Sequence, residues 1–474
     1  MVNVKLPRLG ATRRVDCGDE QDPRDVHSQR GEIVNSFVDS LPAELEKNAA
    51  IWELVRPRTY EQIECGLRYR SYTSDQSKWQ LDAARKIELY SSLPDSYVPS
   101  QDAIDFTAEL LGRLRAGVEA RTFRNPAYKK HYFAQADILR GQRQGAVQDV
   151  VPFSPGGLFK VVGASQMGKS AYLRRFKAML PPPIEVDAAE LGFRPMYVIP
   201  CIALTMPPCE TVEQLLKDLR FQIIAATGKL IAHNRALSLL RGENINQAVA
   251  ACIAFNVCSI VVDGCSHSTT TNRSLEVIRF LLQLEARTGI PIVITATPAF
   301  MHRCSVHGSF SSNFINGRVL ALDACGPDEV LSRRKVDGNP GVWYSQNEFY
   351  LSMALFPRPM TSVELPLWTY RISAAVRGFL ARGFKAFLST LSRYPHLLTP
   401  EGINEELVTA VFEKELRSSK GARNVVAKSL VSPSDISETE FLQYADYLSA
   451  DVIELPQNRF RLDSYSGRQV ARHA

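Results

Sequence analysis

Four residues at a fixed spacing could do chemistry on phosphates. Gly163, Gly168, Lys169 and Ser170 fit the pattern G-x-x-x-x-G-K-[ST] in the stretch LFKVVGASQMGKSAYLRRF, residues 158–176. The glycines let the backbone curl so that successive N–H groups face inward, and the start of a helix also favours an anion. The pattern therefore indicates a loop that holds a phosphate chain.

The segments on either side of this loop are the ones that the pattern requires. An apolar run that ends at Val161 and Val162 is typical of a buried strand, and SAYLRRFKAML has apolar residues at helical spacing. Strand, loop and helix in this order favour nucleotide binding over a glycine-rich turn with a surface lysine. We expect Lys169 to reach the β- and γ-phosphates of ATP, and Ser170 to bind Mg²⁺. The residues expected to contact the nucleotide are Gly163, Ala164, Ser165, Gln166, Met167, Gly168, Lys169, Ser170 and Ala171.

A carboxylate at the end of another strand completes the expected Mg²⁺ site. Asp263 closes the apolar run CSIVVDG, and a phosphate-binding loop needs a distant carboxylate to orient Mg²⁺ and its waters. The predicted metal ligands are therefore Ser170 and Asp263. The alternative is an aspartate that only caps the loop after its strand.

The residue after Asp263 bears on hydrolysis. In hydrolytic proteins with this strand arrangement a glutamate normally follows, and it activates the attacking water as a general base. Gly264 stands there instead, and losing a positioned base lowers the rate by about 10²–10⁴-fold. We expect ATP to be bound and turned over slowly or not at all, which leaves open whether the protein is an enzyme. Thr297 is the candidate catalytic residue, as a sensor of the γ-phosphate, and Thr295 is the competing position.

Composition narrows the class of protein. The chain has 474 residues, 45% of them hydrophobic, and a net charge of +6. These values are ordinary for a globular protein of two to four domains, and the mild positive charge is compatible with a nucleic-acid partner. No apolar run is long enough to span a bilayer, so no membrane association is expected. The nine cysteines form no C-x-x-C pair, which favours reduced thiols in the cytoplasm.

Alternating strand and helix patterns predict an α/β fold with a parallel sheet covered on both faces. The expected strands are the apolar run that ends at Val161 and Val162, and the stretches 194–204, 258–264, 291–297 and 318–323. The expected divisions are an N-terminal extension at 1–100, a nucleotide-binding core at 101–325, a small C-terminal helical domain at 326–417, and a linker and tail at 418–474.

With these residues in place, the chain resembles the AAA+ transposition regulators of the TnsC, TniB and MuB kind over roughly residues 95–410. GVEARTFRNPAY is similar to the family segment G-Y-x-x-R-N-P, with candidate matches at Gly117, Arg121, Asn125 and Pro126. DGCSH is similar to D-E-x-x-H and keeps Asp263 and His267. TGIPIVITATPA is similar to the sensor strand and puts Thr297 at the sensor.

The resemblance implies a P-loop NTPase (AAA+) core that binds ATP and Mg²⁺ and oligomerises on double-stranded DNA. Its expected form is a ring or filament, with six or more subunits. Such a regulator marks a target site, recruits the transposase and is loaded by a target selector of the TniQ or TnsD type, in the bacterial cytoplasm at the nucleoid. The family arginine before a phenylalanine is Asn313 here, so Arg303 or Arg318 would have to act on a neighbour's γ-phosphate.

Basic residues in three segments are candidate contacts to the DNA backbone, which requires lysine and arginine and little base recognition. They are Lys129 and Lys130 between aromatic residues, and Thr271 and Arg273 after Asp263. One continuous helix over 369–393 would place Arg371, Arg382 and Arg393 along a single stripe. For each of these residues a solvated surface is the alternative.

Two other functions compete with a DNA-binding regulator. A signalling NTPase could oligomerise on ATP binding without DNA, although the RNP segment argues against it. A metabolic kinase is disfavoured by the long polar N-terminal region, the helical C-terminal domain and the lack of an arginine-rich lid.

Overall fold

The computed structural model describes residues 49–121, 126–142, 156–186, 196–207, 211–228, 245–269, 272–306, 314, 317–324, 326, 341–357, 364–399 and 401–462. The chain divides into two compact units, Met1–Leu41 and Pro42–Ala474, and all of these residues lie in the second. Over these ranges, no helix is both long and apolar enough to cross a membrane.

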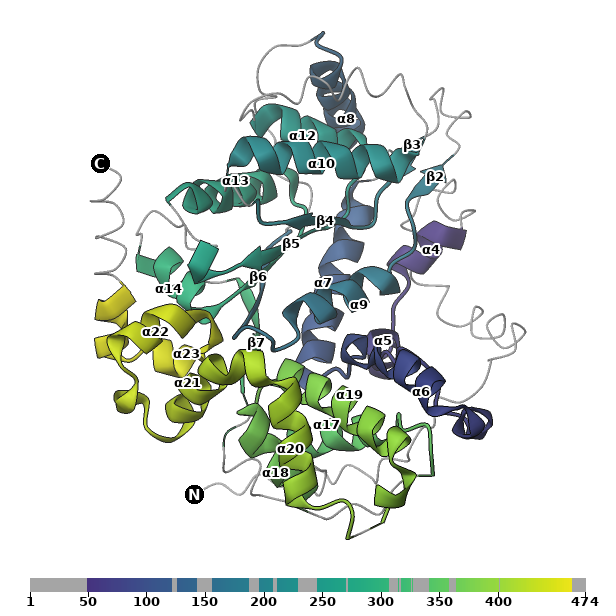
Figure 1. The fold of residues 1–474 in the computed structure, drawn as a ribbon. Helices are drawn as coiled ribbons and strands as arrows, with labels where there is room; N and C mark the ends of the chain where they lie inside the picture. Colours follow the sequence, from purple (N-terminus) through teal and green to yellow (C-terminus); the bar gives the residue numbers. More distant parts are fainter. Residues whose placement is uncertain are drawn as a thin grey trace, which may run out of the picture. The chain divides into compact units, whose positions relative to one another are not determined.

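A five-stranded sheet lies at the centre of this unit (Figure 1). The strands follow the order β4-β5-β6-β1-β7 and every neighbouring pair is parallel. The alternating patterns predicted such a sheet, and this prediction is confirmed. The strands are β1 (Leu158–Gly163), β4 (Ile202–Thr205), β5 (Ile260–Cys265), β6 (Ile292–Ala296) and β7 (Arg318–Leu322).

The single strand predicted over 194–204 is wrong in its extent. Two strands occupy this stretch: β4 joins the large sheet, while β3 (Met196–Val198) pairs antiparallel with β2 (Ile184–Val186). Pro200 lies between β3 and β4 and has no N–H group to donate to a strand ladder. An apolar run alone did not reveal this division.

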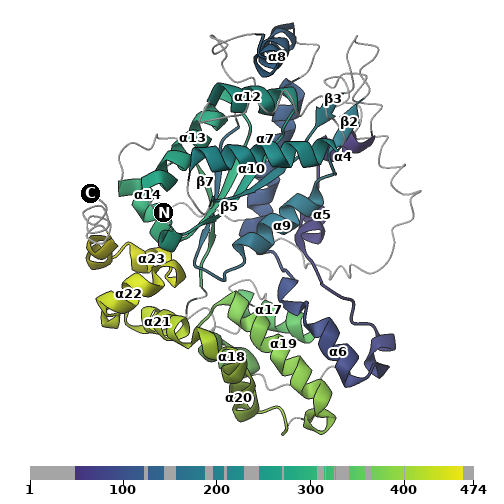
Figure 2. The same cartoon turned by 45° about the horizontal axis from the view of Figure 1, so that its top comes forward.

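Alternate side chains of a strand point to opposite faces of the sheet, and in the central strands β1, β5 and β6 the residues of both faces are mostly buried. On one face, Leu158, Ile260 and Ile292 belong to a large apolar cluster. Figures 1 and 2 show the helices of that cluster together on one side of the sheet. They are α10 (Val212–Thr227), α12 (Ile245–Ala254) and α13 (Asn272–Thr288). The helix α8 (Pro126–Leu139) packs on α12.

Aromatic rings fill the other face. Phe159 of β1 packs edge-to-face on Phe106 of α7 (Gln101–Ala120), and Phe106 packs edge-to-face on Tyr172 of α9 (Lys169–Met179). The Tyr172 hydroxyl lies 2.9 Å from the Thr107 hydroxyl, so this ring is also held by a hydrogen bond. This packing fixes α9, the helix after the phosphate loop, against the sheet.

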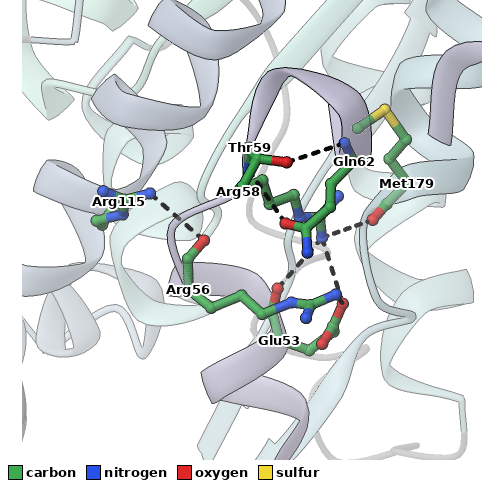
Figure 3. A network of polar contacts seen from close by, with 7 residues as sticks. All are labelled: Glu53, Arg56, Arg58, Thr59, Gln62, Arg115 and Met179. Carbon is green, nitrogen blue, oxygen red and sulfur yellow. Dashed lines mark hydrogen bonds and ion pairs between the residues drawn. The ribbon is translucent and has the colours of Figure 1, made fainter. Parts of the chain in front are cut away.

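The N-terminal residues of the unit bind to the same helix. Arg58 donates to the carbonyl of Met179 at the end of α9 (3.0 Å) and to the carbonyl of Glu53 (3.3 Å), as Figure 3 shows. Arg115 of α7 donates to the carbonyl of Val55 (2.7 Å). These bonds tie α4 (Ala49–Val55) and the segment before α5 (Tyr60–Leu67) to α7 and α9. The next helix, α6 (Ala83–Tyr90), contacts the helical region that follows the sheet.

The helical domain after the sheet contains, within its described residues, the helices α17 (Val342–Leu351), α18 (Leu365–Ser373), α19 (Arg377–Arg393) and α20 (Glu405–Glu415). One helix over 369–393 is therefore wrong. Ala374 and Ala375 have φ of 51° and 59°, and this left-handed backbone ends α18 before α19 begins. Arg371 lies on α18 and forms an ion pair with Glu405 (3.6 Å), so it does not share a stripe with Arg382 and Arg393.

Residues 418–435, which composition indicated as a linker, contain the helix α21 (Lys420–Val431). Val425 of α21 is buried in an apolar cluster formed with the following helices. Those helices are α22 (Glu438–Tyr444), the short 3₁₀ helix η9 (Ala445–Tyr447) and α23 (Ala450–Ile453). The polar residues on the surface of α21 dominate the composition of this stretch, so composition alone did not predict a helix with a buried apolar face. From here on, residues 420–462 are called the C-terminal helices.

Candidate nucleotide site

The loop predicted to hold phosphates joins β1 to α9. Gln166 and Gly168 have φ of 66° and 96°, so the backbone turns sharply before Lys169 begins α9. Such a turn directs successive N–H groups toward one point, and the N-terminus of an eleven-residue helix adds partial positive charge there. The loop therefore has the geometry of an anion site.

Lys169 lies folded against this loop. Its Nζ donates to the carbonyls of Gly163 (2.6 Å) and Ala164 (2.8 Å). Burial lowers the pKa of Lys169 to about 8, and the negative charges of Asp446 and Asp263 oppose this shift. A buried ammonium is stabilised by anions, so a phosphate chain beside Nζ would hold the lysine in its charged form.

Asp263 comes to the same site from β5. It influences the pKa of Lys169, which puts its carboxylate near the loop, and it accepts a hydrogen bond from the Thr295 hydroxyl of β6. Thr295 in turn accepts a hydrogen bond from the Gly264 N–H (3.0 Å). Thr295, the competing sensor position, thus orients the Asp263 carboxylate. Ser170, the other predicted metal ligand, is exposed at the start of α9.

Gly264 has a conformational reason to be glycine. Its φ is +95°, and the pairing of β5 with β6 shifts register between Val262 and Cys265. A residue with a Cβ rarely adopts this backbone, so a glutamate could not stand at this position without strain. The expected base is absent because the strand bulges where the base would be.

Thr297, the predicted sensor, donates its hydroxyl to the carboxylate of Asp446 (2.6 Å). The same carboxylate accepts the backbone N–H groups of His267 (2.7 Å) and Ser268 (2.9 Å), and the Asp446 carbonyl accepts the N–H of Ser165 in the loop (2.7 Å). Asp446 belongs to η9 in the C-terminal helices. A residue far along the chain therefore connects the loop, the segment after β5 and the sensor.

A cleft of about 300 Å³ opens beside the loop. Lys169 and Ser170 line it together with Tyr97 from the N-terminal segment and with Tyr350 and Arg377 from the helical domain. Its size and its mixture of aromatic and cationic side chains suit a nucleotide. The site thus requires three parts of the chain that are distant in sequence.

The first turn of α19 touches the loop directly. The Gly378 N–H donates to the carbonyl of Gln166 (2.8 Å), and a Cβ at Gly378 would lie 2.9 Å from the same backbone oxygen. Only glycine allows this approach without moving the loop. The close contact holds Arg377 at the edge of the cleft.

The strand order decides the fold. β6 lies between β1, which carries the loop, and β5, which carries Asp263, and a helical domain contacts the loop from the other side. The fold is that of a P-loop ATPase of the AAA+ type. The predicted fold class, with its C-terminal helical region, is confirmed.

No family model matches the chain, and no curated protein sequence matches it. Similar solved structures include Cdc6p from Pyrobaculum aerophilum, which is 12% identical with a TM-score of 0.31 and aligns over 56% of this chain and 63% of that chain. A Walker-type ATPase of Pyrococcus abyssi is 12% identical with a TM-score of 0.32 and aligns over 65% of this chain and 91% of that chain. The ORC2 protein of Aeropyrum pernix is 13% identical with a TM-score of 0.32, over 74% of this chain and 95% of that chain. None of these three is named as a transposition regulator.

The candidate DNA contacts do not gather in one described place. Lys129 and Lys130 are exposed on α8. Thr271 and the side chain of Arg273 lie outside the described residues, as do Asn125 and Asn313. The family-like Arg121 donates to the carbonyls of Val257 (2.7 Å) and Thr288 (3.2 Å), so it joins α7 to the segments beside β5 and β6.

Neither arginine proposed to act on a neighbouring subunit stands well for that task. Arg303 is buried, with 7% of its surface exposed. Arg318 begins β7 and pairs with Phe159 of β1, so it lies at the opposite end of these strands from the loop. It forms an ion pair with Glu109 (3.0 Å). The structure favours neither.

Sequence reasoning missed Asp446, Arg377 and Tyr97. Asp446 stands in LQYADYLSAD, which carries no motif. Arg377 had a weak signal, since Gly378 interrupts a helical pattern and such a glycine often marks a close approach of backbones. Tyr97 pairs its backbone with Tyr69 in the N-terminal segment, and no local pattern indicated that this segment reaches the nucleotide site.

Proposed function

We propose that the protein is an ATP-dependent regulator of DNA transposition that binds double-stranded DNA, assembles on it as a ring or filament, and recruits the transposase. A target selector of the TniQ or TnsD type would load it. The observation that carries the nucleotide part is the cleft in which Lys169 and Ser170 of the loop face Arg377 of the helical domain. The transposition part rests on the family-like segments around Arg121, Asp263 and Thr297.

The residues of the site fit ATP and Mg²⁺. Lys169 is a half-buried cation, held only by carbonyl oxygens among its described hydrogen bonds, and a phosphate would complete its environment. The Ser170 hydroxyl and the Asp263 carboxylate are hard oxygen donors of the kind Mg²⁺ prefers. When bound, Mg²⁺ would neutralise phosphate charge, and the protein would supply the loop N–H groups, Lys169 and Arg377 to hold the chain of phosphates.

Hydrolysis is expected to be slow. Gly264 offers no side chain to take a proton, and its backbone conformation excludes the usual glutamate. Subunits would then stay in the ATP-bound state for long periods, and disassembly would depend on a partner. The protein would act as a switch whose ATP state persists.

The candidate DNA-binding surface lies on α8. Lys129 and Lys130 are exposed on α8 and have the charge that a phosphate backbone requires. A signalling NTPase that assembles without DNA would share the nucleotide site and lack this requirement. DNA dependence therefore separates the two functions.

Electron microscopy of the full chain tests the proposal. The protein is mixed with duplex DNA and a non-hydrolysable ATP analogue, with DNA alone, and with the analogue alone. Rings or filaments that need both ligands support the proposed function. Assemblies that need the analogue only would indicate the signalling NTPase, and dispersed Lys169→Ala protein serves as the nucleotide control.

A further inference from the structure

The carboxylate of Asp446 is bound to Thr297, the residue predicted to sense the γ-phosphate. It accepts the Thr297 hydroxyl and two backbone N–H groups, from His267 and Ser268. With 9% of its surface exposed, Asp446 is shielded from water, so these donors replace its hydration. A residue of the C-terminal helices thus holds the sensor hydroxyl.

Asp446 also reaches the phosphate loop itself. Its carbonyl accepts the N–H of Ser165. Its negative charge raises the pKa of Lys169, against the effect of burial, and does so more strongly than the charge of Asp263. Loop N–H groups, the lysine and the sensor hydroxyl are the donors that a triphosphate needs. Asp446 therefore accepts hydrogen bonds from protein donors that a bound triphosphate would otherwise use.

The C-terminal helices have an apolar core of their own. Their apolar cluster contains Phe441, Leu448 and Ile453, and Ala299 of α14 (Pro298–Val306) is its member from the sheet domain among the described residues. Arg423 ties them instead to the helical domain. It makes a bidentate ion pair with Glu413 (2.8 Å for each bond) and donates to the carbonyl of Ile372 (2.8 Å).

We propose that Asp446 is a latch that holds the C-terminal helices on the nucleotide site until a nucleoside triphosphate binds. This inference rests on the proposed function, because it requires the site to take a triphosphate. The Asp446 carboxylate and the terminal phosphate are both anions that would accept the Thr297 hydroxyl, and the Asp446 carbonyl already accepts the Ser165 N–H, so residue 446 and the phosphate cannot use these donors together. A diphosphate lacks the third phosphate and leaves the latch closed. The C-terminal helices then leave Thr297, while Arg423 still joins them to the helical domain.

Hydrogen exchange of the unmodified full chain tests the latch without any variant. Amide exchange in residues 438–462 is compared with no nucleotide, with ADP and with a non-hydrolysable ATP analogue. We expect exchange to be at least tenfold faster with the triphosphate analogue than with ADP. Equal or slower exchange with the analogue would overturn the proposal.

Affinity measurements on two variants sharpen the test. Asp446→Asn removes the charge with little change in shape, and we expect it to bind the triphosphate analogue at least tenfold more tightly, while ADP affinity changes less than threefold. Asp435→Asn is the matched control, since Asp435 is an exposed carboxylate of the same helices, and it should change neither affinity.

The outcomes separate this inference from the proposed function. Weaker triphosphate binding and lost turnover in Asp446→Asn would mean that Asp446 serves the reaction directly, in place of the base missing at position 264, and would overturn the latch. Normal, ATP-dependent assembly on DNA without any response of residues 438–462 would overturn the latch alone. Absence of nucleotide binding in the unmodified chain would overturn both.

Discussion

The phosphate loop and the C-terminal helices meet at the same site but reach it differently. The loop carries its chemistry within a few residues, since Gly168 turns the backbone, Lys169 supplies the charge and α9 supplies the dipole. The C-terminal helices contribute one carboxylate, and only the packing of distant segments brings Asp446 to Ser165 and Thr297. A local motif therefore predicts a phosphate site, while the proposed latch depends on long-range contacts.

Removal of the loop charge should give the largest effect. In Lys169→Ala we expect the affinity for ATP to fall about 100-fold, because the charged hydrogen bonds to phosphate are lost. Isothermal titration calorimetry measures the change. Lys177→Ala is the matched control: Lys177 is exposed in the last turn of the same helix, and its loss should alter affinity less than twofold. Equal effects of the two changes would mean that the loop does not hold phosphate.

The bulge after Asp263 connects the two regions, since it directs His267 and Ser268 toward Asp446. Gly264→Ala should lower the free energy of unfolding by about 1–2 kcal/mol, because a Cβ is disfavoured at φ of +95°. Gly112→Ala is the control of opposite sign, since Gly112 lies inside α7 with open space around it and alanine should stabilise that helix by about 0.5–1 kcal/mol. Chemical denaturation measures both values.

The variant Gly264→Glu extends this comparison to catalysis. If the strained backbone is the reason for the missing base, a glutamate at this position destabilises the fold and does not raise ATP turnover. A stable Gly264→Glu protein with rapid turnover would contradict that account.

The pH dependence of ATP binding reports on Lys169 and Asp446 together. Because burial lowers the pKa of Lys169 to about 8 and phosphate favours its charged form, ATP binding takes up a proton above this pH. We expect affinity to fall about tenfold between pH 7 and pH 9. Asp446→Asn should move the fall to lower pH, because the Asp446 charge raises the pKa of Lys169. Calorimetry in buffers of different ionisation enthalpy measures the proton uptake, and a flat profile would contradict the buried cation.

The sequence was sufficient wherever chemistry and local structure coincide. The strands that end at Gly163 and Cys265, and the helix that begins at Lys169, follow from apolar runs and from the turn between them. Three features lay beyond such patterns. Pro200 divides an apolar stretch between two sheets, and two alanines of left-handed backbone end α18. Polar composition at 418–435 concealed α21 and, with it, the helices that bring Asp446 to the site.

A comparison of Asp263 with Asp446 shows why the position of Asp446 at the site could not be predicted from the sequence. Asp263 ends an apolar strand, and the carboxyl ends of parallel strands meet at one edge of a sheet, so its place follows from the pattern. Asp446 lies in the short 3₁₀ helix η9, and its position depends on how η9 and α23 dock on α14. Docking of this kind is decided by surface fit, which no spacing of residues encodes.

The surface of α8 offers the smallest effect and the sharpest contrast with the buried site. Lys129 and Lys130 are exposed, so each could place its ammonium group against a DNA phosphate. Because they do not line the nucleotide cleft, their removal should leave ATP binding unchanged. In the double variant Lys129→Ala, Lys130→Ala we expect DNA affinity to fall about threefold to tenfold, and the slope of log affinity against log salt to decrease by about 1.8. Fluorescence anisotropy at several salt concentrations measures both. The double variant Lys414→Ala, Lys420→Ala removes the same charge from exposed positions of other helices, and an equal decrease there would mean that net charge, and not α8, determines DNA binding.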